Sequence, residues 1–267
     1  MERIDNKSTF GNVVSWQTLG DPLFIFVHGL GGCKAQFEQA FLNAPLGYGV
    51  LAIDLPGFGE SDRLPSDIEY SFANHASALS DILIQIKDVL RVKKMVLSLH
   101  SMASGLLPKL LEEMKLSFSG IVLIEGNLIL GDAIWSKDLS EMDNTKFKRY
   151  FQYLKKYGHY DLMRSFKAYQ NNTKLNYFAN CYQLADERAF RETAFHTYQN
   201  ADSRLVINAL KNYIGFKLYL RGSLSSPWSG WPILDTAGIN SRIIQNAAHF
   251  PHVDNPIETY ATIYSIN

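Results

Sequence analysis

The sequence predicts an α/β fold in which a mostly parallel sheet is flanked by helices and interrupted by a helical insertion. Short runs rich in β-branched and aromatic residues alternate with longer stretches of helix formers, which is typical of strands joined by crossover helices. The chain has 267 residues, 46% of them hydrophobic, which is enough to bury one large core. Only residues 127–212 break the alternation, because no convincing strand is found there.

Strands are expected where short apolar runs are bounded by turn-forming residues. These runs are Leu23–Val27, Val50–Asp54, Lys94–Leu99, Gly120–Glu125, Phe216–Arg221 and Ser241–Gln245, and a stretch around Asn12–Thr18 would add an antiparallel edge. Helices are expected at Lys34–Leu42, Phe72–Leu90, Ala103–Leu116 and Pro256–Tyr264.

Residues 127–212 are interpreted as an insertion into one domain made of residues 1–126 and 213–267. Because the insertion follows the end of a strand, it would lie over the edge where open α/β sheets bind ligands, which makes it a candidate cap or lid. Its many Tyr and Phe residues favour a small-molecule substrate with an apolar or aromatic acyl group. Most of these rings are nevertheless expected to pack the insertion onto the core.

Charge and cysteine content limit the expected partners and compartment. Lysine plus arginine and aspartate plus glutamate number 26 each, so no net field favours nucleic acid or an anionic membrane. No secretory signal is recognised, and no apolar run reaches the length of a spanning helix. We therefore expect a cytoplasmic protein without membrane insertion, with Cys33 and Cys181 as reduced thiols and with no metal or organic cofactor.

A serine stands where the third buried strand gives way to a helix, in the sequence LHSMA at residues 99–103. A serine at such a sharp turn has its hydroxyl exposed over the sheet edge, where a base can reach it and the helix N-terminus favours negative charge. The alternative is that Ser101 is buried and only caps the helix.

Two glycine-rich turns follow the first two buried strands. The first reads VHGLGG over residues 27–32, and it lacks the Gly-Lys-Ser/Thr ending of a phosphate-binding P-loop. The second reads DLPGFGES over residues 54–61. Near the end of the chain, AAHFP at residues 247–251 lies between the last strand and the last helix, which makes His249 the candidate base and His252 its competitor.

Taken in order, these motifs resemble those of the α/β-hydrolase family, and the resemblance covers nearly the whole chain. The family has an H-G-x-G-G oxyanion loop, a D-x-P-G-x-G-x-S turn, a G-x-S-x-G nucleophile elbow and a histidine before the last helix. This sequence departs from the elbow at Leu99, where the family has glycine. By resemblance Asp54 has a structural role only. A serine in place of an aspartate nucleophile argues against a dehalogenase or an epoxide hydrolase.

The resemblance leaves the acid of a triad to be assigned. Most of the family places it after the penultimate strand, where this sequence has Ser225. A subset, including some haloalkane dehalogenases, supplies it from the preceding strand, which here ends at Glu125. Glu125 is therefore the candidate, although it could instead pair with a basic residue or cap the insertion. Asp132 and Asp235 are weaker alternatives.

The resemblance implies a carboxylesterase-like serine hydrolase with a helical cap. Ser101 would be the nucleophile, His249 the base and Glu125 the acid, and the backbone amides of Leu30 and Met102 would form the oxyanion hole. His28, Gly29 and Gly31 would support that hole. A thioesterase, a C–C hydrolase or a perhydrolase could use the same triad, and a non-catalytic ligand-binding protein could have the same fold.

Overall fold

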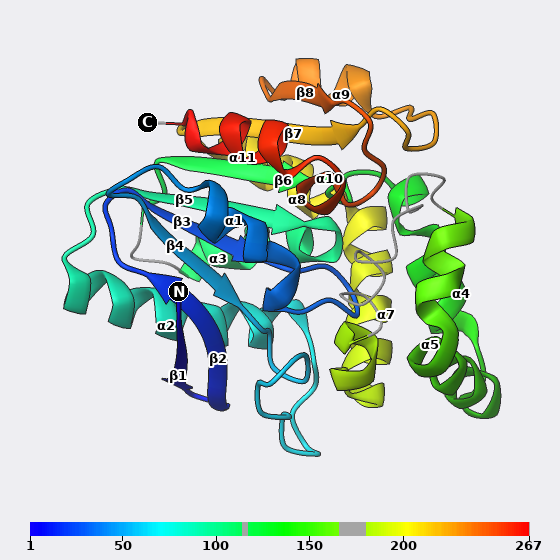
Figure 1. Cartoon of the computed structure of the whole chain (residues 1–267). Coiled ribbons are helices and arrows are strands. Elements are labelled where there is room, and N and C mark those ends of the chain that lie inside the picture. Colours follow the sequence, from blue (N-terminus) through cyan, green and yellow to red (C-terminus); the bar gives the residue numbers. More distant parts are fainter. Residues whose placement is uncertain (114–116, 166–179, 267) are drawn as a thin grey trace.

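An eight-stranded sheet runs through the molecule in the order β1-β2-β4-β3-β5-β6-β7-β8 (Figure 1). The structure is a computed structural model that describes residues 1–113, 117–165 and 180–266. The strands are β1 (Glu2–Ser8), β2 (Gly11–Thr18), β3 (Leu23–Val27), β4 (Gly49–Ile53), β5 (Met95–His100), β6 (Gly120–Ile124), β7 (Phe216–Gly222) and β8 (Asn240–Ile244).

The sheet is parallel from β4 to β8, and β1 and β2 form an antiparallel hairpin at its edge. Six buried strands and the antiparallel edge were expected, and the mostly parallel sheet is confirmed. Strand β1 was not expected, because its sequence ERIDNKS is polar and its side chains are mostly exposed. It pairs with β2 along its whole length through the backbone, which a side-chain pattern does not reveal.

Helices cover both faces of this sheet. They are α1 (Glu38–Asn43), α2 (Phe72–Leu90), α3 (Leu107–Glu113), α4 (Ile134–Glu141), α5 (Asn144–Ser165), α7 (Glu187–Ser203), α8 (Leu205–Asn212), α9 (Trp231–Thr236), α10 (Pro251–Asp254) and α11 (Pro256–Tyr264). Short 3₁₀ turns occupy Lys34–Phe37, Ser101–Leu106 and Leu130–Ala133.

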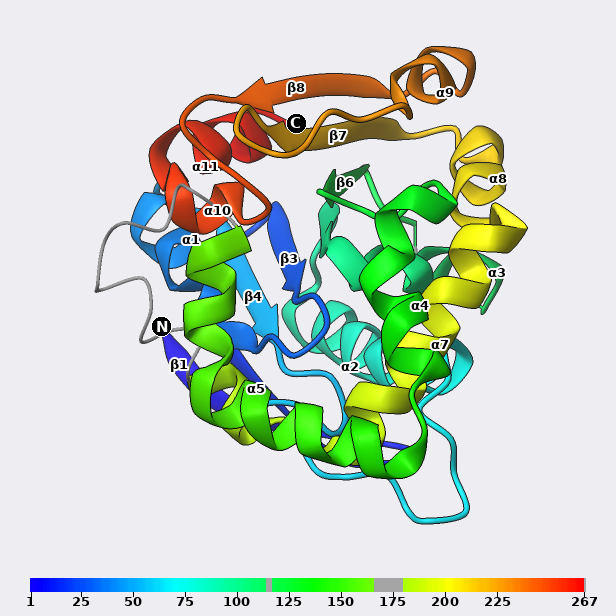
Figure 2. The same cartoon turned by 90° about the vertical axis from the view of Figure 1, so that its right-hand side faces the viewer.

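Alternation of side chains along the buried strands divides the core into two layers. On β3, Phe24 and Phe26 belong to a cluster with residues of α1 and α11. Ile25 and Val27, which alternate with these two residues along the strand, belong to the opposite cluster, which includes residues of α2, α3 and α8. Figures 1 and 2 show these two groups of helices on opposite sides of the sheet.

The helix expected at Ala103–Leu116 begins later than predicted. Residues Ser101–Leu106 form a 3₁₀ turn, α3 starts at Leu107, and residues 114–116 lie outside the described residues. Ser104 and Gly105 are weak helix formers, and Pro108 suits the first turn of a helix, so local preference favours the later start. A Cβ on Gly105 would lie 2.2 Å from the Phe72 ring, so the turn packs closely against α2.

Between β6 and β7 the described chain is helical. Helices α4, α5 and α7 lie beyond the carboxyl ends of the parallel strands, and α8 returns beside α3 (Figures 1 and 2). The Phe190 side chain of α7 is fully buried against Phe147 and Phe151 of α5. Several aromatic residues considered for the insertion, namely Tyr160, Phe166, Tyr169, Tyr177 and Phe178, lie outside the residues whose side chains are described.

Cys33 and Cys181 are joined by a disulfide, so the prediction of two reduced thiols is wrong. Cys33 directly follows the glycine-rich loop after β3, and Cys181 belongs to the helical segment between β6 and β7. The two cysteines are 148 residues apart, and the pairing was not predicted because contact between distant segments cannot be read from one sequence. Disulfides are typical of oxidising compartments, so this bond does not support the predicted cytoplasmic location, which stays a prediction.

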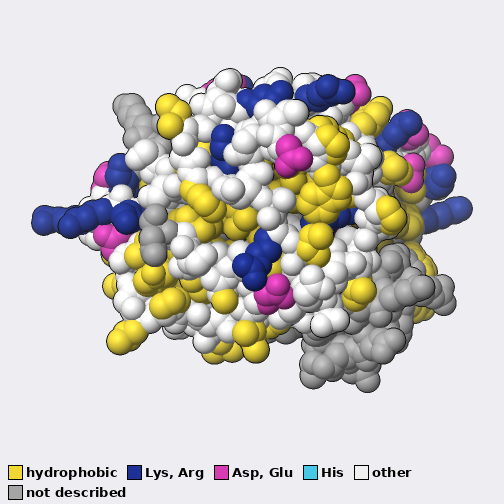
Figure 3. Space-filling model, turned by 90° about the horizontal axis from the view of Figure 1, so that it is seen from above, with side chains coloured by type: hydrophobic (Ala, Val, Ile, Leu, Met, Phe, Trp, Pro, Cys, Tyr) yellow, Lys and Arg dark blue, Asp and Glu magenta, His cyan; other side chains and the backbone are white. Residues whose placement is uncertain are grey.

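The surface carries charges of both signs. On the face that Figure 3 shows, Lys and Arg side chains and Asp and Glu side chains lie among uncharged and hydrophobic ones. This mixture agrees with the equal totals of 26 basic and 26 acidic residues. In the described part of the chain, no helix combines the length and apolar character that crossing a bilayer requires.

Candidate active site

Ser101 stands at the junction of β5 and the following 3₁₀ turn, with a backbone φ of +50°. This left-handed conformation turns the chain sharply, as in a nucleophile elbow. Leu99, which stands where the family has glycine, is fully buried in the core and pairs with Val27 of β3, so its bulk does not obstruct the turn. Ser101 lines a cavity, which argues against the interpretation that it is only a buried cap.

His249 brings its imidazole to this hydroxyl from the loop after β8. Its Nε2 lies 3.0 Å from Ser101 Oγ, within hydrogen-bond distance. The loop is held from both sides, because His100 Nε2 donates to the His249 carbonyl at 2.9 Å and Asp254 accepts from the Ala248 amide at 2.9 Å. The structure therefore joins two residues that are far apart in sequence.

Glu125 directly follows β6, also with a φ of +50°, and its side chain is 3% exposed. Its Oε2 lies 3.8 Å from His249 Nδ1, which is an ion-pair distance for a protonated imidazole and longer than a hydrogen bond. Arg221 Nη1 lies closer to the same oxygen, at 2.9 Å. Glu125 therefore lies beside both residues that the sequence offered as its partner, the histidine and a basic residue.

Opposing effects act on the Glu125 carboxyl. Burial raises the pKa of this carboxyl. The neighbouring His249 and Arg221 and the Ser225 hydroxyl lower it, and because their combined effect is larger than that of burial, the pKa lies below its ordinary value. The group is therefore a carboxylate at neutral pH. Arg221 was not predicted to be part of this site. The sequence feature that could have indicated it is a basic residue near the end of β7, the strand that pairs with β6.

The loop after β3 approaches the elbow closely. A Cβ on Gly29 would lie 2.9 Å from His100 Nδ1 and 3.0 Å from Ser101 Cβ, so only glycine fits there without a shift. Gly31 has a φ of +71°, and a Cβ on it would meet the Tyr182 ring at 2.6 Å. Leu30 and Met102, whose amides are the predicted oxyanion donors, both line the cavity beside Ser101.

The buried His28 ties this loop to the next turn. Its Nδ1 lies 2.8 Å from the Gly29 carbonyl, and its Nε2 accepts from the Leu55 amide at 3.1 Å. Nδ1 is therefore the protonated nitrogen, and the ring has no free lone pair for a substrate proton. Burial lowers the pKa of His28, which keeps the ring neutral.

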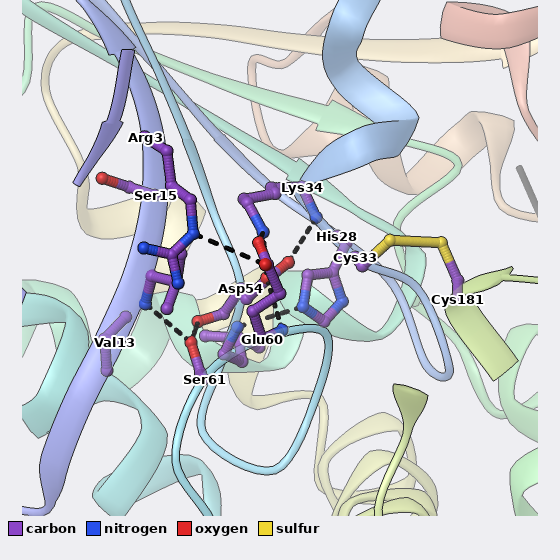
Figure 4. A network of polar contacts seen from close by, with 12 residues as sticks. Arg3, Val13, Ser15, His28, Cys33, Lys34, Asp54, Glu60, Ser61 and Cys181 are labelled. Carbon is purple, nitrogen blue, oxygen red and sulfur yellow. Dashed lines mark hydrogen bonds and ion pairs between the residues drawn. A yellow bond between two sulfur atoms is a disulfide. The ribbon is translucent and has the colours of Figure 1, made fainter. Parts of the chain in front are cut away.

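Asp54 anchors the other end of the loop, as Figure 4 shows. The fully buried carboxylate accepts from the Lys34 amide at 2.6 Å, from Lys34 Nζ at 2.7 Å and from the Glu60 amide at 2.9 Å. Lys34 also pairs with the Glu60 carboxylate. Lys34 follows the bonded Cys33, so an ion pair and a disulfide fix the same stretch of backbone (Figure 4). These contacts fit the structural role expected for Asp54.

The cavity above Ser101 has a volume of about 360 Å³. Its floor comes from the sheet edge and includes Ser101 and His249. The described residues that line it from the segment between β6 and β7 are four apolar or aromatic ones, three polar or charged ones and a glycine: Trp135, Tyr150, Leu154, Tyr182, Asn127, Asp132, Ser136 and Gly158. A substrate next to Ser101 would therefore touch both the sheet edge and these helices.

The competing candidates are placed elsewhere or otherwise engaged. His252 is fully buried and stacks on Phe37, and burial lowers its pKa to about 3. Asp132 lines the cavity, but its oxygens accept from the Trp228 indole and from the Leu128 and Ile129 amides. Asp235 is exposed on α9.

Within the described ranges, no group of three or more His, Cys, Asp or Glu side chains is arranged to hold a metal ion.

Comparison with known proteins agrees with this geometry. A family model described as the alpha/beta hydrolase fold matches residues 22–256, so the chain belongs to the α/β-hydrolase fold family. No curated protein matches the sequence.

Three solved structures illustrate what the chain is similar to. A thermophilic esterase from Thermogutta terrifontis superposes with a TM-score of 0.77 at 16% identity, over 99% of this chain and 97% of that one. The esterase EaEST from Exiguobacterium antarcticum gives a TM-score of 0.74 at 19% identity, over 97% and 98%. A variant of the N-acyl homoserine lactonase AidH complexed with N-hexanoyl homoserine gives 0.73 at 16% identity, over 99% and 95%. At these identities the likeness establishes the fold.

Proposed function

We propose that the protein is a serine hydrolase that cleaves a carboxylic ester or a related acyl bond through a triad of Ser101, His249 and Glu125. The observation that carries the proposal is the 3.0 Å contact between Ser101 Oγ and His249 Nε2 at the floor of a cavity. Glu125 lies on the other side of the imidazole and supplies a buried negative charge. Family membership and the esterase and lactonase among the similar structures support the same chemistry.

The reaction would proceed through an acyl-enzyme. His249 Nε2 takes the hydroxyl proton while Ser101 Oγ bonds to the carbonyl carbon, and the amides of Leu30 and Met102 stabilise the oxyanion. As the intermediate collapses, the bond to the alcohol oxygen breaks and the imidazolium returns its proton to that oxygen. Water, deprotonated by His249, then attacks the acyl-enzyme and releases the acid and free Ser101. The Glu125 carboxylate stabilises the imidazolium in both steps.

The helical segment between β6 and β7 would act as a cap that shapes the acyl pocket. Trp135, Tyr150, Leu154 and Tyr182 contribute apolar surface to a cavity of about 360 Å³. Cavities of this size suit small molecules. We therefore propose an apolar or aromatic acyl substrate, with lactones included because they are cyclic carboxylic esters.

Hydrolysis of a substrate panel by the wild-type protein and Ser101→Ala tests this function. The panel contains short-chain and long-chain p-nitrophenyl esters, lactones and acyl thioesters. The wild-type protein should hydrolyse at least one ester or lactone, and Ser101→Ala should lose on the order of 10⁴-fold or more in kcat. Ser265→Ala, at an exposed serine that directly follows α11, is the matched control and should retain activity. Activity that survives in Ser101→Ala would refute the proposal, and preference for thioesters would redirect it to a thioesterase.

A further inference from the structure

Three hydrogen-bond donors and the imidazole of His249 surround the Glu125 carboxylate. Its Oε1 accepts from the Gly222 amide at 2.7 Å and from Ser225 Oγ at 2.6 Å. Its Oε2 accepts from Arg221 Nη1 at 2.9 Å and faces His249 Nδ1 at 3.8 Å. Ser225 stands where most of the family has its acid, so in this protein the residue at that position binds the relocated carboxylate.

Arg221 is itself fixed in place. Its Nη2 donates to the Ser226 carbonyl at 2.7 Å, and its guanidinium lies 5.1 Å from the centre of the Trp228 ring. That ring stacks on Tyr219 at 4.8 Å. The Arg221 side chain is only 11% exposed, so its charge is weakly screened by solvent. A guanidinium held in this way cannot leave the carboxylate without losing several contacts.

We propose that Arg221 and Ser225 are positioning residues of the triad: together they hold Glu125 ionised and oriented, and Arg221 competes with His249 for the same carboxylate oxygen. This inference depends on the proposed hydrolase function for its catalytic consequence. Neither residue lines the cavity among the described residues, so neither is placed to bind substrate. Their effect should therefore appear in kcat and in the pH profile and hardly in KM.

The expected direction of the pH effect follows from the charges around the pair. Arg221 lowers the pKa of Glu125, so its removal should raise that pKa. Among the described residues, the titratable and charged groups around the pair are Arg221, Tyr219, His100 and His252, with Asp132 beside Arg221 and Tyr219 and with Asp254 on the Ala248 amide. Of these, Arg221 is the cation in contact with the carboxylate, so its removal should move the acidic limb of the profile, where Glu125 takes up a proton, to higher pH.

The test compares four variants in kcat, KM and the pH dependence of kcat/KM. Arg221→Gln should lower kcat about tenfold or more and move the acidic limb up by roughly 1 pH unit, at nearly constant KM. Arg221→Lys should restore most of the pH profile because it keeps the charge. Ser225→Ala should lower kcat with a smaller pH shift. Arg242→Gln is the control: it removes the same charge from neighbouring β8, where Arg242 is 56% exposed and contacts Glu258 instead.

Stability measurements keep the proposal testable without turnover. Glu125 has a lowered pKa in the folded state, so its contribution to stability is present above the unfolded pKa and is lost as the pH falls through the folded pKa. The urea midpoint of Arg221→Gln should therefore fall furthest below wild type near neutral pH, and the gap should narrow in acid. A gap that does not change with pH would mean that Arg221 only packs.

Failures of the two proposals are distinguishable. A wild-type protein with no hydrolase activity would refute the proposed function, whereas a pH-dependent stability gap would still show the charge interaction. If Arg221→Gln matches Arg242→Gln in both the pH profile and the stability gap, the positioning role is refuted. If Arg221→Gln does not fold, Ser225→Ala carries the comparison with Arg242→Gln, and a wild-type kcat in Ser225→Ala would refute the proposal.

Discussion

The left-handed backbone of Ser101 is the local feature on which the site depends. A non-glycine residue in this region costs about 1–2 kcal/mol, and the surrounding structure offsets that cost. Ser104 Oγ donates to the Ser101 carbonyl at 2.7 Å and accepts from the Asn127 amide at 2.9 Å, which holds the turn against the chain after β6. The strained turn is thus bonded to the segment that begins just after Glu125.

At the same scale, the choice of carboxylate can be tested directly. Glu125→Gln keeps the size of the side chain but removes the charge that stabilises the imidazolium, so kcat should fall by about 10²–10⁴-fold. Asp235→Asn, on the exposed surface of α9, should leave kcat within about twofold. Initial rates on the best ester of the panel measure both. If Asp235→Asn were the more damaging change, the acid would be wrongly assigned.

At the scale of elements, the loop after β3 and the elbow after β5 have to approach closely. Gly29→Ala places a Cβ 3.0 Å from Ser101 Cβ, so the loop or the serine must move. We expect kcat/KM to fall on the order of 10²-fold, comparable to the loss of an oxyanion donor. Gly131→Ala is the control, because the nearest atom to its Cβ would be 3.8 Å away. Equal kinetics for the two variants would contradict the close approach.

The sequence predicts the elements well where side-chain pattern and burial agree. The predicted bounds of β3, α2 and α11 coincide with those observed, because each has a buried face or a clear start. Strand β1 is missed because backbone pairing alone stabilises a polar, exposed segment. In the candidate site, motif order indicates Ser101, His249 and Glu125, but Arg221 contacts the carboxylate only because β6 and β7 are neighbours in the sheet.

At the scale of the whole molecule, the Cys33–Cys181 disulfide should contribute much of the stability. A bond that closes 148 residues constrains the unfolded chain strongly, so removing it should cost roughly 2–5 kcal/mol in free energy of unfolding. Urea unfolding of Cys33→Ser/Cys181→Ser should show this loss. Wild-type protein in reductant should match the variant. The disulfide would be contradicted if the variant had the same urea midpoint as the wild-type protein and mass spectrometry found two free thiols in the wild-type protein.

Buried histidines should make the fold sensitive to acid. Burial lowers the pKa of His75 and His252 to about 3. In the unfolded chain these groups titrate near 6.5, so between the two values the unfolded state binds more protons. Their contribution to stability is present above pH 6.5 and is lost as the pH falls toward 3. The urea midpoint of the wild-type protein should therefore drop across this range. His252→Leu should drop less steeply, and an equally steep drop would contradict this account.

The central claim is that Ser101 carries an activated hydroxyl. Incubation with a fluorophosphonate probe, followed by peptide mass spectrometry, reports this directly, because the probe forms a stable phosphonate ester only with a serine whose proton is accepted by a base. We predict a single adduct on Ser101, and its absence in Ser101→Ala and strong reduction in His249→Ala. An unmodified Ser101 under conditions that label a known serine hydrolase would contradict the account.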